Sequence, residues 1–249
     1  MTDSVTAQIA DGNLFNAPAN TVGRFGWKAQ QATLLAFSGD AYRNEIGVTN
    51  RFFPTDAAPY LLGTEPPDQS ALQAAEPAGI TPNSLQDTPS NPMMPESAQN
   101  QDDIDRLTTF MQLLAPPPTV PLTEKAQRGN RLFGEVGCAQ CHTPSMTTGP
   151  SKVSVSLSFK PVPLYSDLLL HHMGSLGDGI VQGAAQGDEM RTAPLWGLRG
   201  RGPFLHDGRA QTALEAIRLH DGEAKIVRDR FLVLPQTQQG EILEFLNSI

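Results

Sequence analysis

The chain has 249 residues and a formal net charge of −8, and 39% of its residues are hydrophobic while 6% are aromatic. A chain of this length can bury the core of one large or two small domains, and its 21 prolines and 22 glycines predict many loops. The negative charge argues against nucleic acid or an anionic membrane surface as a partner, and no apolar run approaches the roughly 20 residues that span a membrane.

The N-terminal half predicts a helix followed by a long connection. We expect the helix over residues 28–37. Residues 52–105 contain no Lys or Arg, and nine of the 21 prolines lie between positions 54 and 95. This composition predicts an irregular, acidic, proline-rich connection.

A second helix is predicted at the end of this connection. Asp102 can cap it, and the positions that follow the 3.6-residue period are Ile104, Leu107, Phe110, Met111 and Leu114. The three prolines at 116–118 end it. We therefore place a domain boundary here, between residues 1–115 and 116–249.

An amphipathic helix opens the second domain at Thr123 and runs directly into Cys138. Its apolar face consists of Ala126, Gly129, Phe133 and Val136. Gly129 has no side chain to hold a partner away, so it permits a close helix crossing. The expected partner is the C-terminal helix, whose apolar stripe contains Ile242, Phe245, Leu246 and Ile249.

A short strand or extended edge is predicted over residues 153–159. The apolar residues there alternate strictly with others, at Val153, Val155, Leu157 and Phe159. The rest of the second domain is expected to be helix or loop, which makes the fold mainly α-helical.

The two cysteines of the chain belong to the segment Cys-Ala-Gln-Cys-His at positions 138–142. Both thiols of such a segment can add to the vinyl groups of a haem, while the adjacent histidine binds the iron from one side. A structural zinc site needs about four ligands, usually from two such pairs, and the chain has no further cysteine. A thioredoxin-type dithiol follows a strand and opens a helix, whereas this pair closes a helix. The segment therefore predicts one covalent haem, with His142 as its proximal ligand.

The sixth ligand of the iron has several candidates, which are Met146, Met173, His171, His172, His206 and His220. Met146 is too near His142 in sequence to reach the opposite face of the haem. His220 is better placed, because Thr212 and Glu215 form a capping box that begins a helix with His220 on its apolar face. Met173 is the alternative ligand, and either residue could instead be an ordinary part of the core.

Two arginines are candidates for contact with the haem propionates. Arg191 and Arg209 each carry a guanidinium group, which suits a carboxylate, although surface salt bridges are an equal alternative.

Several longer segments carry a family resemblance. They are residues 191–198 (RTAPLWGL), 205–209 (LHDGR), 214–220 (LEAIRLH), 165–171 (YSDLLLH) and 23–29 (GRFGWKA). Together they resemble the bacterial di-haem cytochrome c peroxidases, and more closely their di-haem oxidoreductase branch, also labelled thiol oxidoreductases.

The resemblance implies two cytochrome c-like haem domains, in which the C-terminal haem transfers electrons and the N-terminal haem meets peroxide. His220 occupies the position of the sixth ligand to the electron-transfer haem, so the resemblance implies bis-histidine ligation, which generally lowers the haem potential. Residues 43–47 (RNEIG) resemble the segment bearing the glutamate that acts as acid and base over the peroxidatic iron, which nominates Glu45, with an ordinary surface carboxylate as an equal alternative. Many relatives also hold Ca²⁺ between the domains, so Ca²⁺ is a candidate cofactor.

The chain departs from this pattern because it has no second Cys-x-x-Cys-His segment. We therefore expect a partial first domain, with Glu45 and Trp27 as remnants of a site whose haem is missing, followed by a cytochrome c-like domain. The expected function is electron transfer by one haem. The alternative is part of a peroxidase-like enzyme that needs a second haem domain, and a third possibility is a mono-haem enzyme in which His220 leaves the iron.

The expected partners are a small cytochrome or similar electron donor, an upstream haem domain, or a second copy of the chain. Residues 1–8 show neither the basic nor the apolar region of a signal peptide. Covalent haem is attached outside the cytoplasm, so we expect a periplasmic or otherwise extracytoplasmic protein whose leader was removed, or a fragment of a longer chain.

Overall fold

The computed structural model describes residues 22–48, 50 and 103–249, which fall into two compact units. Of these residues, 22–30 and 115–249 form the larger unit, and 31–48, 50 and 103–114 form the smaller one. The described residues form six α-helices and two small antiparallel sheets, so the structure is helical with minor strand content.

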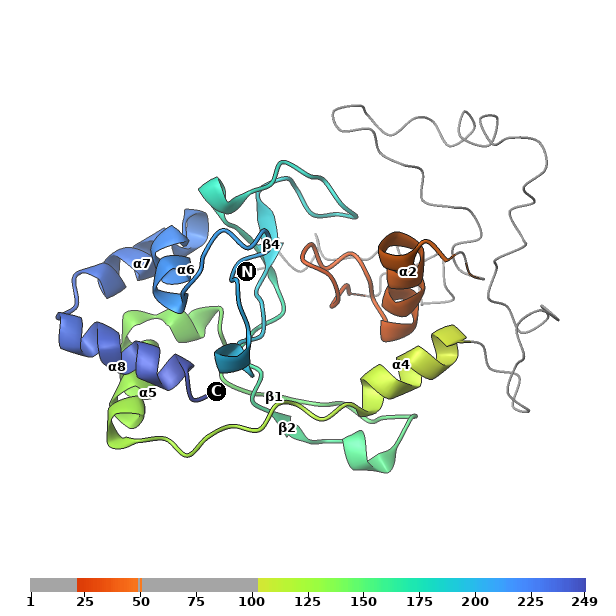
Figure 1. Cartoon of the computed structure of the whole chain (residues 1–249), viewed down its shortest axis with the longest axis horizontal. Helices are drawn as coiled ribbons and strands as arrows, with labels where there is room; N and C mark the ends of the chain where they lie inside the picture. The colour runs from red at the N-terminus through yellow and green to blue at the C-terminus, as the bar shows by residue number, and fades with distance from the viewer. Residues whose placement is uncertain (1–21, 49, 51–102) are drawn as a thin grey trace. The chain divides into compact units, whose positions relative to one another are not determined.

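The smaller unit contains two helices that pack on each other, α2 (Leu34–Ile46) and α4 (Asp103–Leu113) (Figure 1). The Thr108 hydroxyl of α4 donates a buried hydrogen bond to the Ser38 hydroxyl of α2 at 3.2 Å. The helix predicted at the end of the acidic connection is confirmed. Its Asp102 cap and residues 52–102 of that connection lie outside the described residues.

The helix expected over residues 28–37 is wrong in its start, because α2 begins at Leu34. The Thr33 side chain accepts a hydrogen bond from the amide of Ala36 and caps the helix there. Residues 28–30 belong to the larger unit instead, where Lys28 is buried and Ala29 adopts a positive φ of 53°.

The larger unit is built on the crossing of α5 (Glu124–Val136) and α8 (Gln236–Leu246), which lie side by side in Figure 1. The predicted crossing is confirmed at Gly129, where an added Cβ atom would lie 1.9 Å from the carbonyl oxygen of Glu241. The Thr123 cap is also confirmed, since its side chain accepts from the amide of Ala126.

The core of the larger unit consists of apolar side chains of three helices, α5, α8 and α7 (Lys225–Leu232), and of Ile249, which follows α8. Its fully or nearly fully buried members are Ala126, Phe133, Val136, Phe231, Ile242, Phe245, Leu246 and Ile249. The ring of Phe133 packs edge-on against that of Phe245, with centroids 5.4 Å apart. This core fixes the C-terminal end of α5, where the cysteine segment begins.

The remaining elements of the larger unit are short. Helix α6 covers Ala213–Leu219. Strands β1 (Met146–Thr147) and β2 (Pro161–Val162) form one antiparallel pair, while β3 (Leu170–His172) and β4 (Glu189–Arg191) form another, with Leu170 opposite Arg191.

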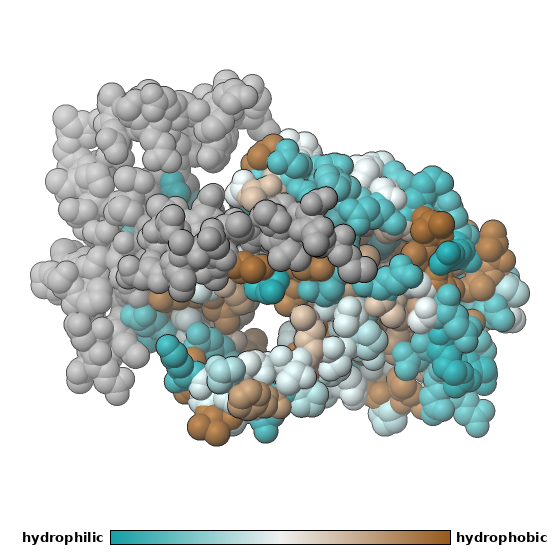
Figure 2. Space-filling view, turned by 180° about the vertical axis from the view of Figure 1, so that it is seen from behind, coloured by the Kyte–Doolittle hydropathy of each residue, from teal (hydrophilic) through white to brown (hydrophobic). Residues whose placement is uncertain are grey.

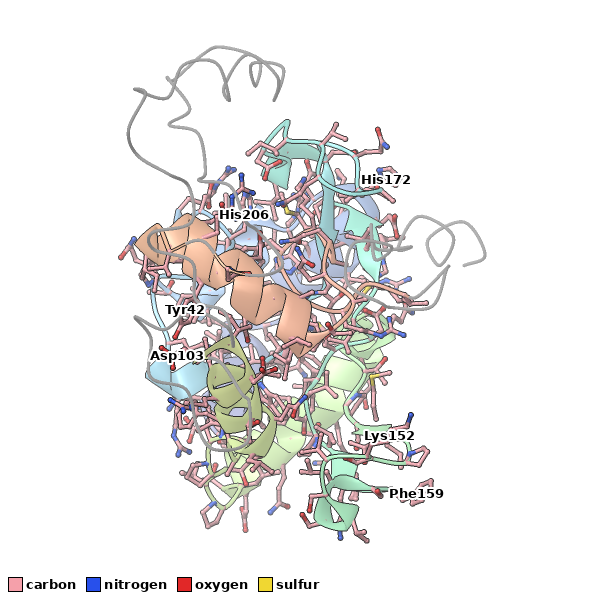
Figure 3. The ribbon with its side chains drawn as sticks, turned by 90° about the vertical axis from the view of Figure 1, so that its right-hand side faces the viewer. Tyr42, Asp103, Lys152, Phe159, His172 and His206 are labelled. Atoms are coloured by element: carbon pink, nitrogen blue, oxygen red, sulfur yellow. The ribbon has the colours of Figure 1, made fainter. Side chains whose placement is uncertain are left out.

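The strand predicted over residues 153–159 is wrong. This segment is a loop with one 3-10 turn at Val155–Leu157, and Lys152 and Phe159 mark it in Figure 3. The Ser151 hydroxyl accepts hydrogen bonds from the amides of Val153 and Ser154. These local bonds replace the hydrogen bonds that a neighbouring β-strand would otherwise supply. Val155 is accordingly 86% exposed.

Among the described helices, none has the length and apolar character needed to cross a membrane. On the face shown in Figure 2, hydrophobic residues form separate patches among hydrophilic ones.

The Gly129 crossing can be tested with a matched pair of substitutions in α5. Gly129→Ala inserts a carbon against the Glu241 backbone, so it should lower the free energy of unfolding by roughly 2–3 kcal/mol. Gly134→Ala on the same helix meets nothing within 4 Å and should be neutral or stabilise by up to about 1 kcal/mol. Urea unfolding followed by circular dichroism measures both, and equal effects would contradict the close crossing.

Candidate functional site

A cavity of about 350 Å³ lies in the larger unit, between the end of α5, helices α6 and α7, and residues 190–206. Most of its wall is apolar. The polar and sulfur-bearing side chains that line it include Trp27, Cys138, Cys141, His142, Met173, Arg191, Arg201, His206, His220 and Glu223. A mostly apolar cavity with a few convergent polar groups is typical of a cofactor site.

The cysteine segment enters the cavity directly from the end of α5. Gly137 ends the helix with a φ of 110°, a conformation that favours glycine, and a 3-10 turn follows over Cys138–Gln140. No disulfide joins the two cysteines. Burial raises the pKa of the Cys138 thiol to about 11, so this thiol lacks the thiolate character of a dithiol redox centre.

His142 presents its Nε2 edge to the cavity because its other nitrogen is occupied. The Nδ1 atom lies 3.0 Å from the carbonyl oxygen of Tyr165, to which it donates in the neutral form. Burial, assisted by the nearby His220, lowers the pKa of His142 to about 4. A neutral imidazole with one nitrogen held by a carbonyl is the usual arrangement of a metal ligand.

His220 lines the same cavity. The predicted capping box is confirmed, since the Thr212 side chain accepts from the amide of Glu215 and the Glu215 carboxylate accepts from the amide of Thr212. The helix ends one residue earlier than expected, at Leu219, and His220 follows it as the cap. Its Nδ1 lies 2.7 Å from the carbonyl oxygen of Ala216, and burial lowers its pKa.

The two imidazoles are spaced as a pair of axial ligands would be. The ring centroids of His142 and His220 are 6.4 Å apart, and the ring planes are tilted by 53°. One metal ion at about 2 Å from each Nε2 atom places the ring centres roughly 6 Å apart. The residues present therefore fit a single iron held between these two rings.

The other predicted axial candidates differ in their surroundings. Met173 lines the cavity. His171 lies between Asp167 at 3.1 Å and Glu223 at 2.9 Å, and the hydrogen bond to Asp167, followed by the contact with Cys141, raises its pKa to about 11. His172 lies 3.1 Å from the Asp188 carboxylate, which raises its pKa.

His206 has a buried ring nitrogen without a hydrogen-bond partner among the described residues. Its Nε2 is buried, and its ring lies edge-on to Trp27 with centroids 6.2 Å apart. Figure 3 shows His206 well separated from His172. His206 also lines the cavity.

The basic side chains at the cavity are only partly those that the sequence indicated. Arg191 lines it and donates from Nε to the carbonyl oxygen of Gly26 at 2.8 Å. Arg209, by contrast, pairs with Asp207 and the carbonyl oxygen of Ser175, and it is not among the lining residues. Arg201 also lines the cavity and was missed in the sequence.

Burial lowers the pKa of both Arg191 and Arg201, and neither has a carboxylate within 4 Å among the described residues. Their described hydrogen bonds go to backbone carbonyls, among them Thr192 for Arg191 and Trp196 for Arg201. Arg191 is partly buried and Arg201 is exposed, and both line the cavity without a described counter-ion, which favours an anionic group there.

Trp27 reaches the cavity because a buried lysine fixes its segment. The Lys28 ammonium is 2% exposed and contacts the Asp178 carboxylate at 2.9 Å and the carbonyl oxygens of Gln186 and Gly187 at 3.0 and 3.3 Å. The carbonyl oxygen of Trp27 also accepts from the amide of Arg191 at 2.8 Å. These contacts join residues 22–30 to the cavity wall.

Glu45 lies in the other unit, exposed in the last turn of α2. Its role as acid and base stays a prediction.

A family model described as "Di-haem oxidoreductase, putative peroxidase" matches residues 7–249. The chain belongs to this family. The predicted resemblance to di-haem oxidoreductases is thereby confirmed, and membership supports a haem-dependent oxidoreductase kind of function.

Among solved structures, the chain is similar to hydrazine synthase of Kuenenia stuttgartiensis, determined under xenon pressure. The two are 20% identical with a TM-score of 0.42, and the match covers 59% of this chain and 55% of that chain. The chain thus matches about half the length of that protein. No curated protein sequence matches it.

The lysine anchor of the Trp27 segment can be tested by removing its charge at nearly constant length. Lys28→Met leaves the Asp178 carboxylate and two carbonyl oxygens without their donor, so we expect a loss of roughly 2–4 kcal/mol in unfolding free energy. The exposed Lys152 supplies the control, since Lys152→Met should change stability by at most about 0.5 kcal/mol. Chemical denaturation measures both, and a Lys28→Met protein as stable as the control would contradict the anchoring role.

Proposed function

We propose that the larger unit is a cytochrome c-like domain that carries one covalent haem and transfers electrons. The observation that supports this most strongly is the pairing of His142 and His220. Both rings are neutral, both have Nδ1 held by a backbone carbonyl, and their centroids are 6.4 Å apart across the cavity. Cys138 and Cys141 stand beside this pair with the spacing that covalent haem attachment requires.

Different residues would bind different parts of the cofactor. Cys138 and Cys141 would form the thioether bonds, and His142 and His220 would bind the iron from its two faces. When bound, the haem supplies one-electron redox chemistry, and two histidine ligands favour a lower potential than histidine with methionine. The apolar wall keeps water away from the site.

The propionates of the haem would meet the basic side of the cavity. Arg191, which is partly buried, and Arg201, which is exposed, line the cavity without a described carboxylate partner, and His206 lines it too. We infer that these three groups compensate the propionate charges. Arg209 has a local partner in Asp207, which makes it a weaker candidate for this role.

The location and partners follow from the same proposal. A covalently attached haem implies a periplasmic or otherwise extracytoplasmic protein. The net charge of −8 suits a basic electron-transfer partner such as a small cytochrome. A haem domain upstream or a second copy of the chain would supply the second haem that the family name implies, and Ca²⁺ remains a candidate cofactor between domains.

The family description favours a second candidate function, because it includes peroxidase activity. In this alternative the chain is part of a peroxidase-like enzyme, with a second haem domain, and Glu45 moves a proton during cleavage of the peroxide bond. The two candidates differ in their response to peroxide. A ferric haem that stays low-spin when peroxide is added indicates a carrier, and one that reacts indicates an enzyme.

The sixth ligand can be tested by comparing two variants of the haem-loaded chain. His220→Ala should convert the ferric haem from a low-spin to a largely high-spin spectrum, because the imidazole that faces the iron is lost. Met173→Ala should leave the low-spin spectrum unchanged. Optical and electron paramagnetic resonance spectra record the spin state of both variants. A high-spin Met173→Ala protein and a low-spin His220→Ala protein would identify Met173 as the sixth ligand instead.

A further inference from the structure

His220 stands at the end of a short helix, so α6 alone holds it weakly. The helix has seven residues, and His220 itself leaves the helical conformation with φ −57° and ψ 130°. Helix ends fray, and helices this short depend on tertiary contacts for their stability. The position of the imidazole must therefore depend on what holds the loop that follows it, residues 221–224.

The carboxylate of Glu223 ties this loop to strand β3 with both of its oxygens. One oxygen lies 2.9 Å from the Nδ1 of His171, and the other accepts from the backbone amide of His172 at 2.9 Å. The backbones also touch, since a Cβ atom added to Gly222 would lie 2.1 Å from the carbonyl oxygen of His172. No side chain larger than that of glycine fits there without displacing the loop from β3.

A second contact joins the loop to the turn after β3. The Asp221 carboxylate accepts from the amide of Ser175 at 3.2 Å, and the Arg228 guanidinium donates to the carbonyl oxygen of His220 at 2.8 Å. Of these contacts, only those of Glu223 reach the histidine ring that lies next to the cysteine segment.

His171 in turn contacts Asp167 and the cysteine segment, which carries the proximal ligand. Its Nε2 faces the Asp167 carboxylate at 3.1 Å, and its Nδ1 lies 3.9 Å from the sulfur of Cys141. The amide of Asp167 in turn donates to the carbonyl oxygen of Cys141 at 2.8 Å. With a carboxylate against each ring nitrogen, His171 donates to both Asp167 and Glu223.

We propose that Glu223 is a positioning residue that latches the loop after His220 to His171 and β3, and so keeps the His220 imidazole on the haem iron. The inference rests on the proposed function, since it requires His220 as the sixth ligand. Glu223 does not touch the iron. It acts through the loop, which it connects by way of His171 and Asp167 to the cysteine segment.

The latch can be tested by carbon monoxide binding to the ferrous, haem-loaded full chain, because carbon monoxide enters only when the sixth ligand leaves. Glu223→Ala should raise the binding rate about tenfold, as expected for loss of a partly exposed charged hydrogen-bond network. Glu223→Gln should raise it less, because the amide oxygen still accepts from the His172 backbone. Glu135→Ala, which removes an exposed carboxylate from α5, should leave the rate unchanged.

A double variant separates the latch from a general loss of stability. In the His220→Ala background, Glu223→Ala should have no further effect, because the ligand on which the latch acts is gone. A Glu223→Ala rate equal to that of the unsubstituted protein would overturn the latch, and so would an increase that persists without His220. If the unsubstituted protein and His220→Ala bind carbon monoxide equally fast, the proposed ligand itself is wrong, and the latch fails with it.

Discussion

Two hydrogen bonds from histidine rings to the main chain fix the orientation of the two imidazoles that line this cavity. The imidazoles of His142 and His220 each give up Nδ1 to a carbonyl oxygen, of Tyr165 and Ala216 respectively. Each ring is thereby fixed in one orientation with Nε2 directed inward, and burial keeps both rings neutral. Without these bonds the rings could turn or titrate, and the matched spacing across the cavity would be lost.

The rest of the larger unit serves to bring these two rings to the same place. Helix α5 delivers the cysteine segment, and its position is fixed by the approach of Gly129 to the backbone of α8. The capping box at Thr212 begins α6. One face of this helix, with Ala213, Ala216 and Ile217, lines the cavity. The buried Lys28 binds Asp178 and so holds the neighbouring Trp27 at the lining of the cavity. The capping box is local in sequence, whereas Gly129 and Lys28 each contact residues more than 100 positions away.

The sequence was sufficient to predict those features whose causes are local. The cap at Thr123, the glycine on an apolar helix face and the capping box at Thr212 each follow from a short pattern. The cysteine segment predicted haem binding in the same way, which family membership supports, while covalent attachment at Cys138 and Cys141 stays a prediction. The choice of His220 among six axial candidates also came from a local pattern, although its ligand role stays a prediction.

The features that were wrong or missed depend on contacts distant in sequence or on competing hydrogen bonds. Residues 28–30 did not join a helix, because Lys28 is bound by oxygens about 150 residues away. The alternation at 153–159 did not give a strand, because Ser151 bonds the backbone locally. Arg201 reaches the cavity only through the course of the chain after β4, and no sequence motif marks it. The unpartnered nitrogen of His206 is likewise visible only once the walls of the cavity are assembled.

The central claim is that one haem is bound covalently at Cys138 and Cys141. Intact mass spectrometry, together with a pyridine haemochrome assay, tests it on protein produced with the machinery for c-type haem maturation. The account predicts a mass increased by one haem and a haemochrome spectrum typical of two thioether bonds, both lost when the two cysteines are replaced by alanine. An intact mass equal to that of the bare polypeptide would contradict it.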